Sequence, residues 1–199
     1  KIINDILDLS RIEAGKLELD SHDFDLRHCV EGAIELFTEE AQRKGLELSV
    51  FMADDVPDLV KGDSGRLRQI CINLIGNAIK FTKAGEVSLR VTTEGRGRSL
   101  ARVRFEVRDT GIGIEAGMKD RLFQPFTQAD SSISRRFGGT GLVLSISQLL
   151  VGMMKGTIAV ESELGKGTTI TFLLPMEVCN EGDLPAAAEA VAAIMEEAR

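Results

Sequence analysis

The sequence of 199 residues has no tryptophan, no tyrosine, only three cysteines and no uninterrupted apolar run of membrane-spanning length. Its longest nearly apolar stretch, residues 142–154, is interrupted by Ser145, Ser147 and Gln148, whereas a membrane helix needs roughly 20 apolar residues. With no tryptophan, no tyrosine, nine phenylalanines and no basic cluster, the chain lacks the interleaved aromatic and basic residues of a single-strand binder. We therefore expect no membrane insertion by this segment and no nucleic acid as a partner.

Acidic residues outnumber basic ones, 31 against 24, so the formal net charge is −7. The apolar fraction of 43% supports a packed core, and the length suits one domain with short appendages. Cys29, Cys71 and Cys179 are odd in number and form no Cys-x-x-Cys pair. This spacing favours idle thiols in a reducing compartment over a disulfide framework or a zinc site.

The first half of the chain is expected to be mainly helical, because its apolar residues recur at helical spacing. Residues 1–14 carry one apolar stripe and begin without an initiator Met inside a helical pattern, so we expect the sequence to be part of a longer protein. One helix is expected over residues 25–45, capped by Asp25. A strand at residues 46–52 and a helix over residues 63–81 follow.

The second half alternates apolar and polar residues, which predicts strands. A hairpin is expected from residues 87–91 and 101–107, and two closing strands from residues 157–161 and 169–174, with Pro175 as the stop. Between them lie a polar segment that we expect to be a mobile loop and an apolar helix that begins near residue 142. The alanine-rich end of the chain is expected to be a partly helical linker.

The helix over residues 63–81 is predicted to have one ordered polar face. Each asparagine there costs up to about 0.7 kcal/mol of helix propensity relative to alanine, which solubility does not require. An amide oxygen one turn from a lysine can hold hydrated Mg²⁺ and meet phosphate oxygens. The alternative is an ordinary solvated face. The polar face consists of Arg66, Gln69, Asn73, Gly76, Asn77 and Lys80.

Two glycine clusters follow, Asp109-x-Gly111-x-Gly113 and Gly138-Gly139-Thr140-Gly141. Each alone is more often a pair of turns than a nucleotide site, and Asp109 alone could cap a turn. The second cluster precedes a helix whose N-terminus attracts phosphate. The polar helix, both clusters and a basic loop occur in one order within about 75 residues, and this combination indicates a nucleotide site.

The chain up to about residue 176 resembles the catalytic ATP-binding domain of sensor histidine kinases, especially hybrid ones. Residues 68–82 resemble the N box, 109–114 the G1 box, 123–126 the F box and 139–142 the start of the G2 box. The resemblance implies a Bergerat-type α/β sandwich, with helices on one face of a mixed, mainly antiparallel sheet.

The same resemblance implies three regions. Residues 1–19 would be the C-terminal part of the second helix of a dimerisation and phosphoacceptor hairpin. Residues 20–177 would be the catalytic ATP-binding domain, and residues 178–199 a tail or linker.

Residue by residue, the resemblance implies that Asn77 coordinates Mg²⁺, Lys80 contacts phosphate, and Asp109 accepts a hydrogen bond from the adenine amino group. Phe81 would lie against the nucleotide, and Thr168 is a weaker second candidate at the adenine. Further ATP contacts are implied for the glycine clusters, the F box and an ATP lid at residues 127–137: Gly111, Gly113, Phe126, Arg135, Arg136, Gly139, Thr140, Gly141 and Leu142.

Asn73 bears on the reaction type. Related hydrolytic ATPases carry a glutamate at this position to activate water, and an amide is a poor base. With Lys80 beside it, Asn73 favours phosphoryl transfer to a protein side chain over hydrolysis. A hydrolytic ATPase of the same fold is the alternative that this asparagine disfavours.

The implied function is donation of the ATP γ-phosphoryl group, with Mg²⁺, to a histidine on the dimerisation hairpin. His22 and His28 do not stand in the acceptor context, so the acceptor would lie outside this sequence. The implied partners are that hairpin, a response-regulator receiver domain and a second copy in the full-length homodimer. The implied location is cytoplasmic, including the cytoplasmic part of a membrane-bound sensor.

One position departs from the family pattern, because Val143 stands where the G2 box usually has glycine. If glycine is needed there for close approach to phosphate, valine would crowd the triphosphate. The chain would then be a degenerate kinase domain that serves as a docking module. If the position is helical, valine costs little.

Overall fold

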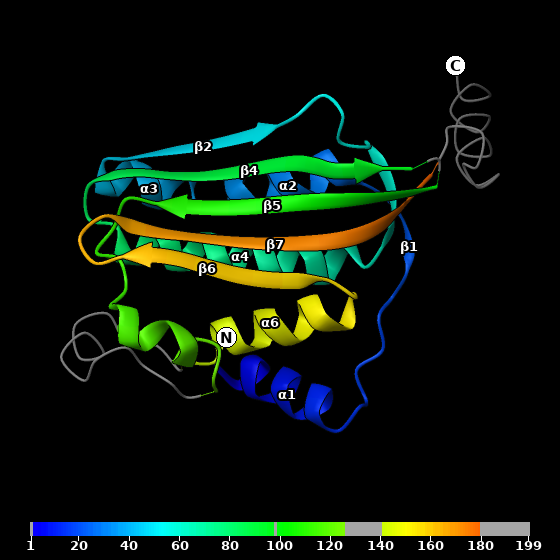
Figure 1. The fold of residues 1–199 in the computed structure, drawn as a ribbon, viewed down its shortest axis with the longest axis horizontal. Helices are drawn as coiled ribbons and strands as arrows, with labels where there is room; N and C mark the ends of the chain where they lie inside the picture. Colours follow the sequence, from blue (N-terminus) through cyan, green and yellow to red (C-terminus); the bar gives the residue numbers. More distant parts are fainter. Residues whose placement is uncertain (1, 98, 126–140, 180–199) are drawn as a thin grey trace, which may run out of the picture.

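The computed structural model describes residues 2–97, 99–125 and 141–179, and shows one sheet with helices packed on one face (Figure 1). The strand order is β1-β3-β7-β5-β4-β2, and β6 also pairs with β7. Only the pair of β2 and β4 is parallel among the described pairs. This confirms the expected α/β sandwich. The strands are β1 (His22–Asp25), β2 (Leu46–Met52), β3 (Leu59–Gly62), β4 (Gly85–Arg96), β5 (Leu100–Asp109), β6 (Thr157–Glu163) and β7 (Gly167–Val178).

In the view of Figure 1, α2, α3 and α4 lie behind the sheet, and α6 lies below β6 with α1 packed on its far side. No helix in the described ranges is long and apolar enough to cross a membrane. The helices are α1 (Ile2–Glu13), α2 (Leu26–Glu35), α3 (Thr38–Lys44), α4 (Ser64–Phe81) and α6 (Val143–Met153), with a short 3₁₀ helix η1 (Ala116–Arg121).

The core lies between the sheet and the apolar side of α4. Leu67, Ile70 and Leu74 on that side are at most 1% exposed. Facing them, Phe105 of β5 and Phe172 of β7 stack with ring centroids 4.6 Å apart and planes 3° from parallel. Burying one such side chain contributes about 1.5–3 kcal/mol. This packing fixes α4 against the strands that lead into the site.

The single helix expected over residues 25–45 is wrong, because two helices occupy this range. The chain leaves α2 at Leu36, which is 63% exposed, and turns so that α2 packs on α4 while α3 packs on β2. Phe37 in the turn packs against Gly76 of α4. The expected start and end of this helical region are confirmed, because Asp25 caps α2 and Gly45 ends α3 with a φ of 66°.

Pro175 does not end the last strand, because β7 continues to Val178. The backbone N–H of Val178 donates to Ser99 O on the β5 side of β7. Because backbone N–H groups alternate between the two sides of a strand, those of odd-numbered residues of β7 point to the opposite edge. On that edge β6 pairs no further than Leu173, and β3 begins at Glu177. Pro175 lies in the gap between these two strands, so its missing N–H removes no ladder hydrogen bond.

Cys29, Cys71 and Cys179 form no disulfide with one another. Burial raises the pKa of the Cys29 and Cys71 thiols, which keeps both protonated and unreactive at neutral pH.

The N-terminal half of the α4 polar face holds α1. Asp8 of α1 accepts a hydrogen bond from Gln69 Nε2 at 2.9 Å and lies 3.4 Å from Arg66 Nη1. Arg66 also donates to Gln69 Oε1 at 2.7 Å. The predicted polar face is therefore divided, and its first half binds another helix of the same chain.

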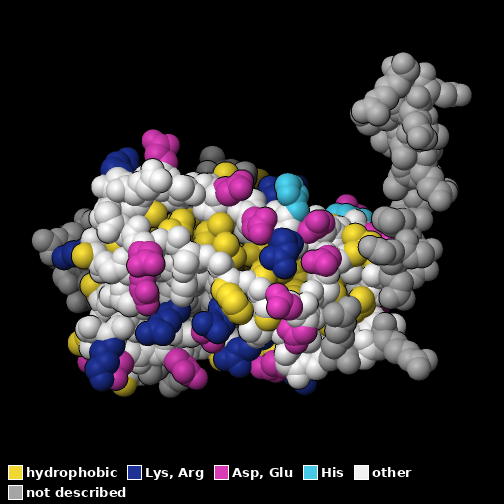
Figure 2. All heavy atoms as spheres, turned by 90° about the horizontal axis from the view of Figure 1, so that it is seen from above, with side chains coloured by type: hydrophobic (Ala, Val, Ile, Leu, Met, Phe, Trp, Pro, Cys, Tyr) yellow, Lys and Arg dark blue, Asp and Glu magenta, His cyan; other side chains and the backbone are white. Residues whose placement is uncertain are grey.

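One edge strand of the sheet is β2, on the side seen from above in Figure 2, where hydrophobic side chains are interspersed with charged ones. Phe51 is 52% exposed, and the guanidinium of Arg90 lies 5.0 Å from its ring centroid. The arginine therefore covers part of the apolar surface of the edge strand.

Asp63 caps α4 and ties the incoming chain to it, because its carboxylate accepts from Arg66 N at 2.9 Å and from Asp20 N at 3.0 Å. Asp63→Ala is expected to lower the free energy of unfolding by about 2–3 kcal/mol in urea denaturation, since it removes a cap and leaves the Asp20 amide without its partner. Asp25→Ala is the matched control, because exposed Asp25 caps only α2 and should cost about 1 kcal/mol. Equal losses would contradict the double role of Asp63.

Candidate functional site

The C-terminal half of α4 carries the residues expected to meet phosphate and metal. Asn73, Asn77 and Lys80 follow one another at i, i+4 and i+7 and share one helix face. Asn73 is 6% exposed, whereas Asn77 and Lys80 are half-buried. The Lys80 Nζ lies 5.0 Å from the ring centroid of Phe81. The structure therefore brings these four predicted residues together.

Asp109 ends β5 and is 8% exposed. Gly111 N donates to its Oδ1 at 2.8 Å, and the Thr168 backbone gives a further hydrogen bond. Burial raises the pKa of the Asp109 carboxyl, and these two hydrogen bonds partly oppose the rise. Thr168 is directly opposite Asp109 in the register of β5 and β7. The two residues predicted at the adenine are thus neighbours.

The loop after Asp109 joins the strand end to α4. Ile112 N donates to Phe81 O at 3.4 Å, and Thr110 N donates to Glu86 O at 3.1 Å. Glu86 N donates back to Thr110 Oγ1 at 2.9 Å. These bonds hold the predicted G1 segment beside the end of the predicted N-box helix.

The glycines of this loop are explained by packing within the protein. A Cβ at Gly113, whose φ is 67°, would meet Glu163 O, and one at Gly111 would lie 2.5 Å from Phe81 O. A Cβ at Gly167 would meet Asp109 O. The expectation that Gly111 and Gly113 allow close approach to a ligand stays a prediction, but both already allow close approach between backbone segments.

Ser162 is a site residue that the sequence analysis missed. Its Oγ accepts from Ile114 N at 2.8 Å and lies 2.8 Å from Gly167 O and 2.9 Å from Thr168 Oγ1. No local pattern distinguishes Ser162 from any other residue of an alternating strand. Its importance depends on partners up to 48 positions away.

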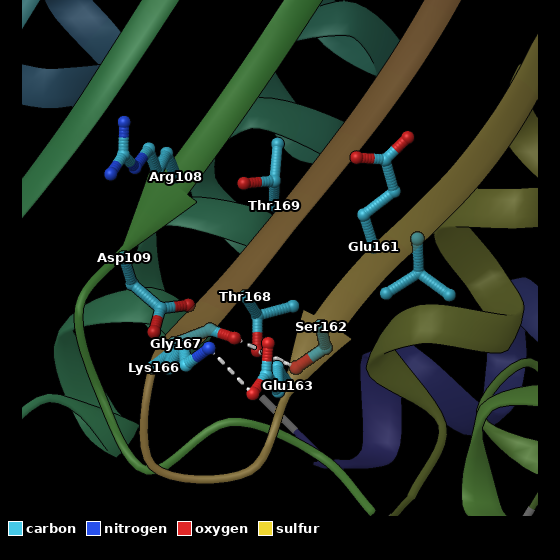
Figure 3. Close-up of a pocket in the computed structure, with 10 residues that line it drawn as sticks. Arg108, Asp109, Glu161, Ser162, Glu163, Lys166, Gly167, Thr168 and Thr169 are labelled. Carbon is cyan, nitrogen blue, oxygen red and sulfur yellow. Dashed lines mark hydrogen bonds and ion pairs between the residues drawn. The ribbon is translucent and has the colours of Figure 1, made fainter. Parts of the chain in front are cut away.

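An open pocket of about 410 Å³ lies at the turn between β6 and β7 (Figure 3). Asp109, Thr168 and Ser162 line it together with Arg108 and Thr169, and Figure 3 shows the ribbon of α4 behind these strands. Its lining comes from β5, β6, β7 and the turn. The pocket therefore touches the Asp109 end of the site and is separate from the polar face of α4.

At the start of α6, Gly141 has a φ of 70°, a conformation that requires glycine, and Leu142 is fully buried. Val143 is the first residue of α6 and does not have a positive φ. Valine therefore causes no backbone strain at this position. Five predicted site residues lie outside the described part of the chain: Phe126, Arg135, Arg136, Gly139 and Thr140.

The described ranges contain no group of three or more His, Cys, Asp or Glu side chains that could hold a metal ion. The side chains that α4 presents here supply the amide oxygens of Asn73 and Asn77 and the ammonium group of Lys80. A single amide oxygen fits Mg²⁺ that keeps several waters and shares phosphate ligands with a nucleotide. The residues present therefore fit Mg²⁺ bound together with ATP.

The sequence was compared with protein families and with individual known proteins, and both comparisons match histidine kinases. The family described as histidine kinase-, DNA gyrase B-, and HSP90-like ATPase matches residues 62–178. The chain is 45% identical over 179 residues to the sensory/regulatory protein RpfC of Xanthomonas campestris, and 46% identical over 177 residues to the signal transduction histidine-protein kinase BarA of Escherichia coli. Each alignment covers 89% of this chain, but only 24% of RpfC and 19% of BarA.

Among solved structures, full-length ShkA in complex with AMPPNP is similar, with a TM-score of 0.77 and 35% identity. That match covers 89% of this chain and 35% of ShkA. The chain therefore spans a quarter or less of the two curated relatives and about a third of the solved one.

The close packing of Gly113 against the β6–β7 turn generates a stability test. Gly113→Ala should lower the free energy of unfolding by about 2 kcal/mol more than Gly165→Ala, because it adds a backbone clash to left-handed strain. Gly165 is the matched control, since its φ is 81° but a Cβ there meets nothing within 4 Å. Urea denaturation measures both, and similar losses would show that the contact with Glu163 can relax.

Proposed function

The chain belongs to the histidine kinase-, DNA gyrase B-, and HSP90-like ATPase family, and we propose that it is the ATP-binding catalytic domain of a two-component sensor histidine kinase. In this proposal the domain donates the γ-phosphoryl group of ATP to a histidine on a dimerisation hairpin of the same protein. The similarity to BarA, a histidine-protein kinase by name, and to a structure that holds an ATP analogue supports this.

The observation that carries the proposal is the amide at position 73. Asn73 is buried on the same face of α4 as Asn77 and Lys80, where an acidic side chain would act as a base toward water. An amide cannot take a proton at neutral pH. Asn73 can orient a neighbouring group without activating water, which favours transfer to a protein acceptor over hydrolysis.

The other residues supply position and charge. Asn77 would give one oxygen to Mg²⁺, and Lys80 would neutralise phosphate oxygens. Asp109 would accept from the adenine amino group, and Phe81 would cover the nucleotide. Bound Mg²⁺ would supply neutralisation of the charge that develops on the transferred phosphoryl group. Catalysis by this chain is then mainly positioning.

The proposed partners follow from the proposed reaction. The acceptor histidine lies on the hairpin to which α1 belongs, and a receiver domain takes the phosphoryl group from it. The contact of Asp8 with Gln69 and Arg66 supports a direct connection between that helix and the nucleotide-binding helix. We propose that the full-length protein is a homodimer through the hairpin, with the region boundaries stated above.

Loss of Mg-ATP binding in Asn77→Ala is the direct test of the site. Because Asn77 would supply the protein's ligand to the metal, we expect at least a hundredfold weaker binding by calorimetry, and a comparable loss for wild type in excess chelator. Gln42→Ala, an exposed amide on α3, is the control and should bind like wild type. Unchanged binding by Asn77→Ala, with the fold verified by circular dichroism, would refute the assignment.

Val143 supports the second candidate function, a docking module with weak or no nucleotide binding. Its half-buried side chain stands at the N-terminal turn of α6, where the family pattern has glycine. Since this residue is helical and unstrained, we expect Val143→Gly to change the Kd for Mg-ATP by less than about fivefold. Calorimetry on both proteins decides the matter. Binding that appears only in Val143→Gly would mean that Val143 blocks an otherwise intact site, and binding by neither folded protein would favour the docking module.

A further inference from the structure

The Ser162 hydroxyl lies where three segments meet, as the dashed lines in Figure 3 show for two of its contacts. It has three partners: the amide of Ile114, the carbonyl of Gly167 and the hydroxyl of Thr168. All three distances lie between 2.8 and 2.9 Å. At such distances each contact must contain a proton, because two bare oxygens would repel.

The direction of all three hydrogen bonds follows from counting protons. A serine hydroxyl has one proton and two acceptor lone pairs. The Ile114 amide can only donate and the Gly167 carbonyl can only accept, so the Ser162 proton points to Gly167 O. The contact with Thr168 Oγ1 at 2.9 Å therefore requires that Thr168 donates its own proton to Ser162.

This assignment fixes what Thr168 offers to a ligand. With its single proton directed to Ser162, the Thr168 hydroxyl presents only lone pairs elsewhere. Thr168 is directly opposite Asp109, whose carboxylate accepts hydrogen bonds from the backbone of Gly111 and Thr168. An ionised carboxylate is also acceptor-only. Two side chains that only accept therefore stand together at this end of the site.

We propose that Ser162 is a positioning residue that makes the site selective for adenine nucleotides over guanine nucleotides, an inference that rests on the proposed function. The adenine amino group offers two N–H donors, whereas guanine carries the O6 acceptor at the equivalent position. Against Asp109 and Thr168, guanine would set acceptor against acceptor. Ser162 holds Thr168 in the accepting state and does not touch the nucleotide.

The test is the ratio of GTP to ATP dissociation constants, measured by calorimetry with Mg²⁺ on the whole chain. Ser162→Ala releases the Thr168 proton, which can then be donated to guanine O6. We expect the ratio to fall about tenfold, mainly through tighter GTP binding. Ser162→Thr keeps the hydroxyl and should restore the ratio to within about twofold of wild type. A merely structural role would weaken both nucleotides equally and leave the ratio unchanged, which overturns the proposal.

Thr168→Val provides an independent arm, because it removes the hydroxyl through which Ser162 acts and keeps the contact of Ser162 with Ile114. It should lower the ratio, and adding Ser162→Ala to it should change the ratio by less than about twofold. A further tenfold change in the double variant would overturn the proposal. If Ser162→Ala does not fold, an unchanged ratio in Thr168→Val overturns it alone.

These outcomes separate the proposal from the function on which it rests. ATP binding by all variants with constant ratios refutes the role of Ser162 and leaves the proposed function standing. Absence of ATP and GTP binding in the folded wild type refutes both.

Discussion

The site depends on one packing constraint: the loop after β5 and the turn between β6 and β7 lie so close that a side chain does not fit between them. A Cβ at Gly113 would meet Glu163 O, and one at Gly167 would meet Asp109 O. This contact places the Asp109 carboxylate beside Thr168 and the loop against the end of α4. The positions of Asp109 and Thr168 are therefore set by backbone contacts within the protein itself.

Three parts of the α4 surface make three different sets of contacts or carry different groups. Its apolar side fills the core against β4 and β5, which fixes its position and direction. The first half of its polar side binds Asp8 of α1, and the second half carries Asn73, Asn77 and Lys80. Because these residues lie on one helix of 18 residues, the core packing and the contact with α1 position the same element that carries Asn73, Asn77 and Lys80.

Sequence reasoning succeeded where the pattern was periodic and local. The helix from Asp63, the hairpin of β4 and β5 and the sandwich architecture follow from hydrophobic spacing and from motif order. It missed β1 and β3, because each has only four residues and little alternation. It wrongly ended the last strand at Pro175, because the gap between β6 and β3 that accommodates a proline depends on the tertiary arrangement and leaves no local sequence signal. It singled out Asp109 from its motif but not Ser162, whose partners lie 5, 6 and 48 positions away.

The gap beside Pro175 also concerns association between chains. Between the end of β6 and the start of β3, neither strand pairs with β7, and unpaired strand edges are the places where another chain can add a strand. A residue with a free amide at this point would offer an incoming strand both a donor and an acceptor. Proline offers the carbonyl alone, so a foreign strand can form only half of the ladder there. The residue that interrupts no bond of the native sheet thus also withholds a hydrogen-bond donor from any strand of another chain at this point.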